Sequence, residues 1–222
     1  LSAYESIMAK IPVDILTEEE SVLIATNRET LVYQFFHAIF DRVVALSILI
    51  VMSPFLVLAV ISILVESGFP FIYKQTRVGK NVKIFNCYKL RSMVKNAEKD
   101  GAKWASENDT RITPLGKILR KTHIDEIPQM WNILSGDIAL VGPRPERPEF
   151  VEKLKLEIPH YFLRHTIRPG FTGWAQIKYR YARTVEDSRE KLQYDLYYIK
   201  NRNVFLDFGI IIKTIQIIVT HI

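Results

Sequence analysis

The chain of 222 residues has a formal net charge of +6, and 48% of its residues are hydrophobic, which is ordinary for a globular protein of one or two domains. Its single cysteine, Cys87, excludes an intrachain disulfide and a cysteine-rich metal site. Much of the positive charge lies in residues 71–99, where eight lysines and arginines accompany one acid, Glu98. Such a stretch favours an anionic partner (phosphate, nucleic acid or a lipid headgroup layer), although a solvated surface would have the same composition.

Residues 1–35 are mixed and polar, with a weak helical pattern over residues 18–25. The chain starts at Leu1 without an initiator methionine or a signal-peptide pattern. We therefore expect this N-terminal segment to come from a preceding region of a longer chain.

Residues 36–67 are predicted to form a membrane helix, because no residue from Val43 to Val65 is charged. At about 1.5 Å per residue, this run is long enough to match a hydrocarbon core of about 30 Å. Pro54 removes one backbone donor, which predicts a bend at Ser53 and Pro54, where the Ser53 hydroxyl can bond a freed carbonyl. Two topologies stay open from the residues alone: a kinked helix that crosses the bilayer, or one that enters and returns to the same side.

Residues 68–222 are predicted to form a soluble domain that ends in an apolar helix. Alternating patterns predict strands at 71–74, 82–90 and 138–141. Helices are expected at 93–105, 126–134, 148–165 and 184–200, followed by one over 204–222 that lies against a membrane surface or against the membrane helix. The expected fold class is α+β: a membrane-embedded helix packed on a small mixed α/β domain with amphipathic helices at the interface.

Two adjacent acids, Asp125 and Glu126, lie in the segment between Arg120 and Gly136. Pro128 is tolerated only in the first turn of a helix, so we expect the helix to begin close to Asp125, which would be its N-cap. The positive end of the helix and its free backbone donors favour a phosphate there. One carboxylate can then attack phosphorus, and the second can act as a base or bind Mg²⁺. An Asp-Glu pair at a helix start is, however, more often only a cap and a solvated acid.

Other groups suited to phosphate lie along the chain, and arginine is well suited to bidentate contact with phosphate oxygens. Prolines in two of these segments would fix the loop before a ligand arrives. Each residue alone is more often structural. The expected phosphate-binding residues are Lys89, Arg91, Arg120, Arg144, Arg147, Arg168 and Gln176.

Several motifs follow one another along the chain. They are the membrane segment with Ser53-Pro54, YKQTRVGK (73–80), YKLRSM (88–93), LRKTHIDEIPQMWNILSGDIALVGPRPERPEF (119–150), RHTIRPGFTGWAQI (164–177) and EKLQYDLYYIKN (190–201). Taken together and in this order, they resemble the bacterial sugar transferase family, the monotopic polyprenyl-phosphate phosphoglycosyl transferases. The resemblance covers roughly residues 36–220, and its later segments look most like the larger members, which have a membrane bundle and an extra domain before the catalytic part.

The resemblance implies a ping-pong reaction that moves a hexose 1-phosphate from a UDP-sugar to polyprenyl (undecaprenyl) phosphate. Asp125 matches the family's nucleophile, which releases UMP, and it is also the expected ligand of Mg²⁺. Glu126 matches the neighbouring acid that activates the acceptor or positions the metal. Such enzymes initiate the assembly of exopolysaccharide, capsule or O antigen.

The resemblance also implies a re-entrant helix with both ends in the cytoplasm and an active site at the inner leaflet of the bacterial cytoplasmic membrane. The expected partners are the UDP-sugar, polyprenyl phosphate and lipids of that leaflet, with no nucleic acid. The identity of the sugar and the formation of a homodimer stay open. Two other functions also fit the residues: a Mg²⁺-dependent phosphohydrolase, in which water replaces the lipid acceptor, and a non-catalytic membrane scaffold with a basic surface.

Overall fold

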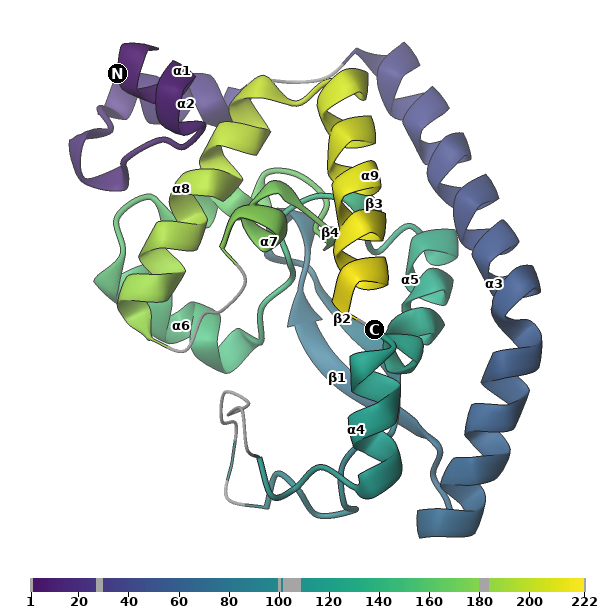
Figure 1. The fold of residues 1–222 in the computed structure, drawn as a ribbon. Coiled ribbons are helices and arrows are strands. Elements are labelled where there is room, and N and C mark those ends of the chain that lie inside the picture. Colours follow the sequence, from purple (N-terminus) through teal and green to yellow (C-terminus); the bar gives the residue numbers. More distant parts are fainter. Residues whose placement is uncertain (1, 27–29, 100, 102–108, 180–183, 222) are drawn as a thin grey trace.

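A computed structural model describes residues 2–26, 30–99, 101, 109–179 and 184–221. Its architecture is α+β, as the sequence predicts, with helices packed around two small sheets (Figure 1). One sheet pairs β1 (Ile72–Val78) with β2 (Ile84–Leu90) in antiparallel register. The other pairs β3 (Ala139–Val141) with β4 (Gly170–Thr172) in parallel, and sequence patterns missed β4 because it has only three residues.

The longest element, α3 (Leu31–Ser67), runs along one side of the molecule and changes direction along its length (Figure 1). It begins earlier than predicted, because the Thr30 side chain caps it by accepting a hydrogen bond from the Tyr33 backbone. Pro54 lies within it, and the Ser53 hydroxyl donates to the Ile50 carbonyl at 2.7 Å. That carbonyl is the one Pro54 leaves without its usual N–H donor, so the expected compensation by Ser53 is present.

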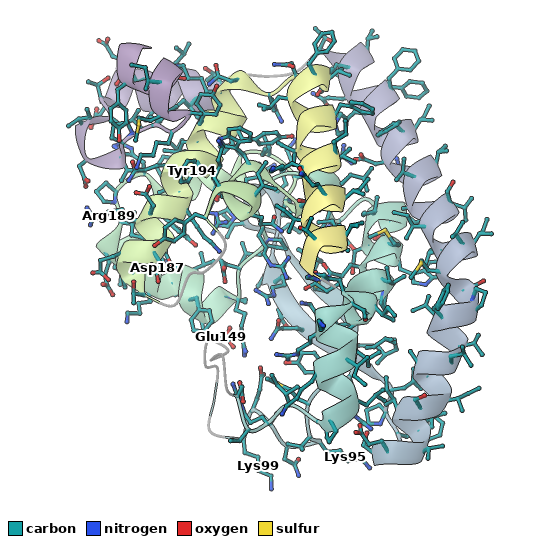
Figure 2. The ribbon with its side chains drawn as sticks, in the orientation of Figure 1. Lys95, Lys99, Glu149, Asp187, Arg189 and Tyr194 are labelled. Atoms are coloured by element: carbon teal, nitrogen blue, oxygen red, sulfur yellow. The ribbon has the colours of Figure 1, made fainter. Side chains whose placement is uncertain are left out.

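Little of α3 is covered by the rest of the protein. Among the described residues it is the one helix that is long and apolar enough to cross a membrane, and only 11% of its most apolar 18-residue window is buried. Side chains project from it away from the other elements along its outer side (Figure 2). A core helix of a water-soluble protein would be covered on more of its surface.

The described N-terminal residues pack on the long helix α8 (Val185–Asn201). This segment contains α1 (Ser2–Met8), a 3₁₀ turn η1 (Val13–Ile15) and α2 (Glu18–Thr26). Lys10 pairs with Glu190 at 2.6 Å, and Glu5 pairs with Lys200 at 2.7 Å. Its apolar side chains, including Ile11 and Val13, belong to the main hydrophobic core.

The remaining elements enclose that core. In chain order they are η2 (Lys80–Val82), α4 (Pro114–Lys121), η3 (Ile124–Gln129), α5 (Met130–Ser135), α6 (Pro148–Glu157), η4 (Tyr161–His165), α7 (Trp174–Lys178) and α9 (Val204–His221). A second, smaller core joins Ala59 and Ile63 of α3 to Leu90 of β2 and Leu119 of α4. The C-terminal half of α3 is therefore packed directly against β2 and α4, the elements that flank η3.

The helix predictions for residues 93–105 and 148–165 are wrong in part. The helix expected over 93–105 is absent from its described residues, because Met93 forms a bridge with Ile112 and turns follow; residues 100 and 102–105 lie outside the described residues. The helix expected over 148–165 ends at Glu157, where Pro159 cannot continue it, and η4 follows. The helices expected over 184–200 and 204–222 are confirmed as α8 and α9 over their described residues.

Candidate active site

The acidic pair lies on a 3₁₀ helix rather than at the start of an α-helix. His123, in the left-handed region with φ of 57°, is the N-cap of η3, and Asp125 and Glu126 lie in the first turn. The prediction that Asp125 is an N-cap is therefore wrong. The tight turns of η3 accommodate Pro128 before α5 begins, and Gly136, with φ of 86°, ends α5 as predicted.

Asn132 fixes the acidic pair beside the end of β2, and the sequence analysis missed this residue. Its side chain is fully buried, accepts a hydrogen bond from the Tyr88 backbone at 3.1 Å and donates to the Asn86 carbonyl at 2.7 Å. The amide thus pairs with the edge of β2 as another strand would. An asparagine inside the apolar stretch Met130–Leu134 was the available signal, because a buried amide must find partners.

Glu126 holds two cations next to the reactive position. The Lys89 Nζ and the Arg144 Nη2 atoms both contact its Oε1 atom at 2.6 Å. Burial by itself would raise the pKa of Glu126, but the charges and hydrogen bonds of Arg144 and Lys89 hold that pKa well below its usual range. Glu126 is therefore an ionised anchor that brings the end of β2 and the loop after β3 together.

Asp125 is in a different environment, although it is the adjacent residue. Its side chain is buried and makes no hydrogen bond among the described residues. Burial, and after it the negative charge of Glu126, raise the pKa of Asp125 to about 6, against the opposing charges of Lys89, Arg120 and Arg144. A carboxylate with unoccupied oxygens beside three cations is suited to attack an anionic phosphorus centre.

The loop that presents Arg144 is held from two sides. Arg164 donates from Nη2 to the Arg144 carbonyl at 2.8 Å, and Arg77 donates from Nη1 to the Pro145 carbonyl at 2.9 Å. Arg164 is buried and also pairs with Asp195 of α8 at 3.0 Å. The loop is therefore fixed before any ligand binds, which lowers the cost of ordering it.

Glycines allow this loop to lie directly against the β4 segment. A Cβ atom at Gly170 would lie 2.0 Å from the Gly142 nitrogen, and one at Gly142 would lie 2.7 Å from the Arg168 carbonyl oxygen. The two backbones thus touch where the sequence has VGPRP and RPGFTG. These motifs build the parallel pair β3–β4 in addition to any role in binding.

Four of the expected phosphate-binding residues have surroundings other than the acidic pair. Arg91 donates to the Ser67 hydroxyl and the Gly68 carbonyl at the end of α3. Arg147 pairs with Glu98 at 2.7 Å. The Gln176 amide donates to the Phe171 carbonyl at 3.0 Å, and Arg168 lines a separate hollow with His37 and Tyr198.

Arg120 stays near the acidic pair. Its Nε atom donates to the Ser92 hydroxyl at 2.8 Å, and its charge is one of those that lower the pKa of Asp125. The structure thus brings together Asp125, Glu126, Lys89, Arg120 and Arg144. The basic stretch 71–99 does not form one surface, because part of it makes internal contacts, whereas Lys95 lies near the end of α3 (Figure 2).

A divalent cation would have few protein ligands here. The described residues contain no group of three or more His, Cys, Asp or Glu side chains placed to share a metal. With the residues that the structure describes, the Asp125 side chain makes no hydrogen bond, and Glu126 contacts its two cations through Oε1. One or two carboxylates completed by substrate oxygens and water is the set that Mg²⁺ prefers, so the residues fit a metal that arrives with a diphosphate.

A model of the family described as bacterial sugar transferase matches residues 32–221, which include α3, the acidic pair and the Arg144 loop. The chain belongs to the bacterial sugar transferase family. Within it, the chain is 40% identical over 216 residues to a UDP-N-acetylgalactosamine-undecaprenyl-phosphate N-acetylgalactosaminephosphotransferase of Aeromonas hydrophila, covering 97% of this chain and 50% of that protein.

Two further relatives show the range of lengths among sugar transferases. A UDP-glucose:undecaprenyl-phosphate glucose-1-phosphate transferase of Klebsiella pneumoniae is 38% identical over 177 residues, covering 79% of this chain and 38% of that protein. An exopolysaccharide production protein PSS of Rhizobium leguminosarum bv. phaseoli is 38% identical over 185 residues, covering 79% of this chain and 91% of that protein. The chain thus spans 50% of the length of the Aeromonas relative and 38% of the length of the Klebsiella relative.

Proposed function

We propose that this chain transfers a hexose 1-phosphate from a UDP-sugar to polyprenyl (undecaprenyl) phosphate through a covalent intermediate on Asp125. The observation that supports this most is the buried Asp125 carboxylate, which has no hydrogen-bond donor in the described part of the chain and lies beside Lys89, Arg120 and Arg144. The activities that name the Aeromonas and Klebsiella relatives agree with this substrate class.

In the first step, an Asp125 oxygen attacks the phosphorus that bears the sugar. The bond from that phosphorus to the bridging oxygen breaks, and UMP leaves with the electron pair. In the second step, an oxygen of polyprenyl phosphate attacks the same phosphorus, and the bond to Asp125 breaks. The products are polyprenyl-diphosphate-sugar and the free carboxylate.

The cations around Asp125 stabilise the charge that both steps place on the phosphoryl oxygens. Arg144 and Lys89 are held by Glu126 and therefore need no rearrangement when the donor binds. Because its pKa is low, Glu126 is a weak base, which favours a positioning or metal-binding role over proton abstraction. Mg²⁺, when bound by Asp125, Glu126 and substrate oxygens, would neutralise the diphosphate and the departing UMP.

We further propose that α3 is re-entrant and that the active site faces the cytoplasmic leaflet of the inner membrane. Both parts of α3 are tied to the same body: Arg42 donates to the Leu134 carbonyl at 3.3 Å, and Glu66 accepts from the Leu115 backbone at 3.0 Å. At about 1.5 Å per residue, the 37 residues of α3 extend about 55 Å. A helix that crossed the bilayer would have its two ends on opposite sides, so the attachment of both ends of α3 to one globular body supports this proposal.

Exchange of labelled UMP tests the two-step reaction. The protein, in detergent, is incubated with UDP-sugar, Mg²⁺ and radiolabelled UMP but without lipid acceptor. A phosphosugar–aspartate intermediate is reversible, so label is expected to enter the UDP-sugar pool, and Asp125→Asn is expected to abolish this exchange. Exchange that needs added undecaprenyl phosphate would indicate direct transfer, and release of free sugar phosphate without acceptor would indicate a hydrolase.

A further inference from the structure

A second hollow in the molecule is lined by cations and lies apart from the acidic pair. The empty space in and above it, part of which is open solvent, is about 420 Å³, and its described lining contains neither Asp125, Glu126 nor the groups that contact them. It lies between the start of α3, η2, β3 and the end of α8. The lining residues are Gln34, His37, Lys80, Ala139, Val141, Ile167, Arg168, Tyr198 and Arg202.

The charges around this hollow favour an anion. Lys80, Arg168 and Arg202 line it, whereas no aspartate or glutamate does. Within the described part of the chain, the side chains of Lys80 and Arg168 make no ion pair or hydrogen bond to another residue. Two cations without acidic partners that share one concave surface attract phosphate-type oxygens.

The hollow lies next to apolar surface that suits lipid. Phe35 and Phe36 of α3, beside the lining residue Gln34, are 63% and 65% exposed. Phe205, three residues after Arg202, is 89% exposed. Asp207 joins the start of α3 to the start of α9. Its Oδ2 atom lies 3.0 Å from the Tyr33 hydroxyl and 2.8 Å from His37 Nε2, both at hydrogen-bond distance. Cations between exposed aromatic side chains are typical of the headgroup level of a membrane.

We propose that this hollow binds the phosphate group of an anionic phospholipid headgroup, held by Lys80, Arg168 and Arg202. The bound lipid would fix the first turns of α3 and the start of α9 at the membrane surface. The proposal rests on the membrane association of α3 but not on the covalent chemistry of Asp125, because the two sites share no residue. Asp125→Asn is therefore expected to leave lipid binding unchanged.

Native mass spectrometry of the full chain released from nanodiscs tests this site. The nanodiscs contain phosphatidylcholine with about one third phosphatidylglycerol, and the ratio of the two lipids retained per protein is measured. The wild type is expected to retain one phosphatidylglycerol in preference to phosphatidylcholine. Lys80→Gln and Arg168→Gln are each expected to lower that preference about fivefold, the effect of one cation at a membrane surface.

Lys83→Gln is the matched control, since Lys83 is an exposed lysine next to η2 that does not line the hollow. Its lipid preference should equal that of the wild type. Lys80→Arg, which retains the charge of this exposed side chain, should restore binding. Equal retention in wild type, Lys80→Gln and Arg168→Gln would overturn the site. Displacement of the lipid by millimolar inorganic phosphate would overturn the assignment to a lipid headgroup and indicate a soluble phosphate ligand.

Discussion

At the residue scale, the adjacent acids Asp125 and Glu126 differ because of their neighbours. Glu126 contacts Lys89 and Arg144 directly, whereas Asp125 is buried without a hydrogen bond among the described residues. The pKa of Asp125 therefore rises while that of Glu126 falls. Opposite shifts in two neighbouring carboxyl groups indicate different roles, and they agree with the proposal that Asp125 is the nucleophile and Glu126 an anchor.

The rate of UMP formation should depend on pH through Asp125. Only the ionised carboxylate attacks phosphorus, and the pKa of Asp125 is about 6. We expect the initial rate of UMP release to level above this pH and to fall about tenfold per unit below it. Rates measured across about pH 4.5 to 8 with UDP-sugar well below its KM test this, because they report the pKa of the free enzyme. A flat profile over that range would contradict the assignment of Asp125.

The same pKa predicts that Asp125→Asn stabilises the protein. In the unfolded chain this carboxyl titrates near 3.8, so its raised pKa favours folding below that pH, and this contribution is lost as the pH rises through about 6. The amide side chain lacks this penalty. The free energy of unfolding of Asp125→Asn is therefore expected to exceed that of the wild type by up to about 3 kcal/mol near pH 7.5. Thermal unfolding in detergent, at about pH 4 and pH 7.5, should show a gain only at the higher pH.

The sequence identified part of the site and missed the rest for a physical reason. Lys89 lies at the end of β2 and Arg144 in the loop after β3. Both contact the acidic pair through Glu126, because these elements are neighbours. Arg147 was grouped with them by its residue type, yet it pairs with Glu98. Arg164 was not singled out, because its function depends on a contact with a loop 20 residues away. Such contacts join residues that are distant in the sequence. They depend on tertiary packing and therefore leave no local sequence pattern.

At the element scale, the loop after β3 depends on buried Arg164. Arg164→Met would leave Asp195 without its counterion and is expected to destabilise the protein by roughly 3–5 kcal/mol. The double variant Arg164→Met/Asp195→Leu should regain most of that stability. It should still have a raised KM for the UDP-sugar, because the Arg144 carbonyl has lost its donor.

Kinetics and thermal unfolding of both variants test this prediction. Arg189→Met on the exposed side of α8 is the control and should behave like the wild type, since its ion pair with Asp14 is exposed and worth little. A double variant with wild-type KM would mean that Arg164 has only a structural role.

The topology of α3 is a second prediction at this scale. Single cysteines at Thr30, before α3, and at Thr76, in β1, are both exposed positions, and the native Cys87 is buried. A membrane-impermeant thiol reagent applied to inside-out vesicles should label both, because the two positions belong to one body on one side of the bilayer. Labelling of only one position would mean that α3 crosses the membrane.

Element types were easier to predict than element ends. The 23-residue uncharged run from Val43 to Val65 and the capping box that begins α8 at Thr184 are local signals, and both helices are present. The 3₁₀ form of η3 depends on a left-handed His123, and β4 exists only because β3 pairs with it. Neither condition is visible in a pattern of apolar residues.

At the scale of the whole molecule, the long apolar helix α3 and the candidate site are one packed unit. Ala59 and Ile63 of α3 share a hydrophobic core with Leu90 of β2 and Leu119 of α4, the elements on either side of the acidic pair. The apolar outer surface of α3 is left uncovered. A lipid acceptor that moves within the leaflet would thus arrive next to the elements that hold Asp125.

Intact-protein mass spectrometry tests the central claim most directly. The protein is mixed with UDP-sugar and Mg²⁺ without acceptor, quenched in acid and weighed. The account predicts a mass increase of one sugar phosphate that is absent in Asp125→Asn and disappears when undecaprenyl phosphate is added. An adduct that persists in Asp125→Asn, or its absence from a wild type that still forms polyprenyl-diphosphate-sugar, would contradict it.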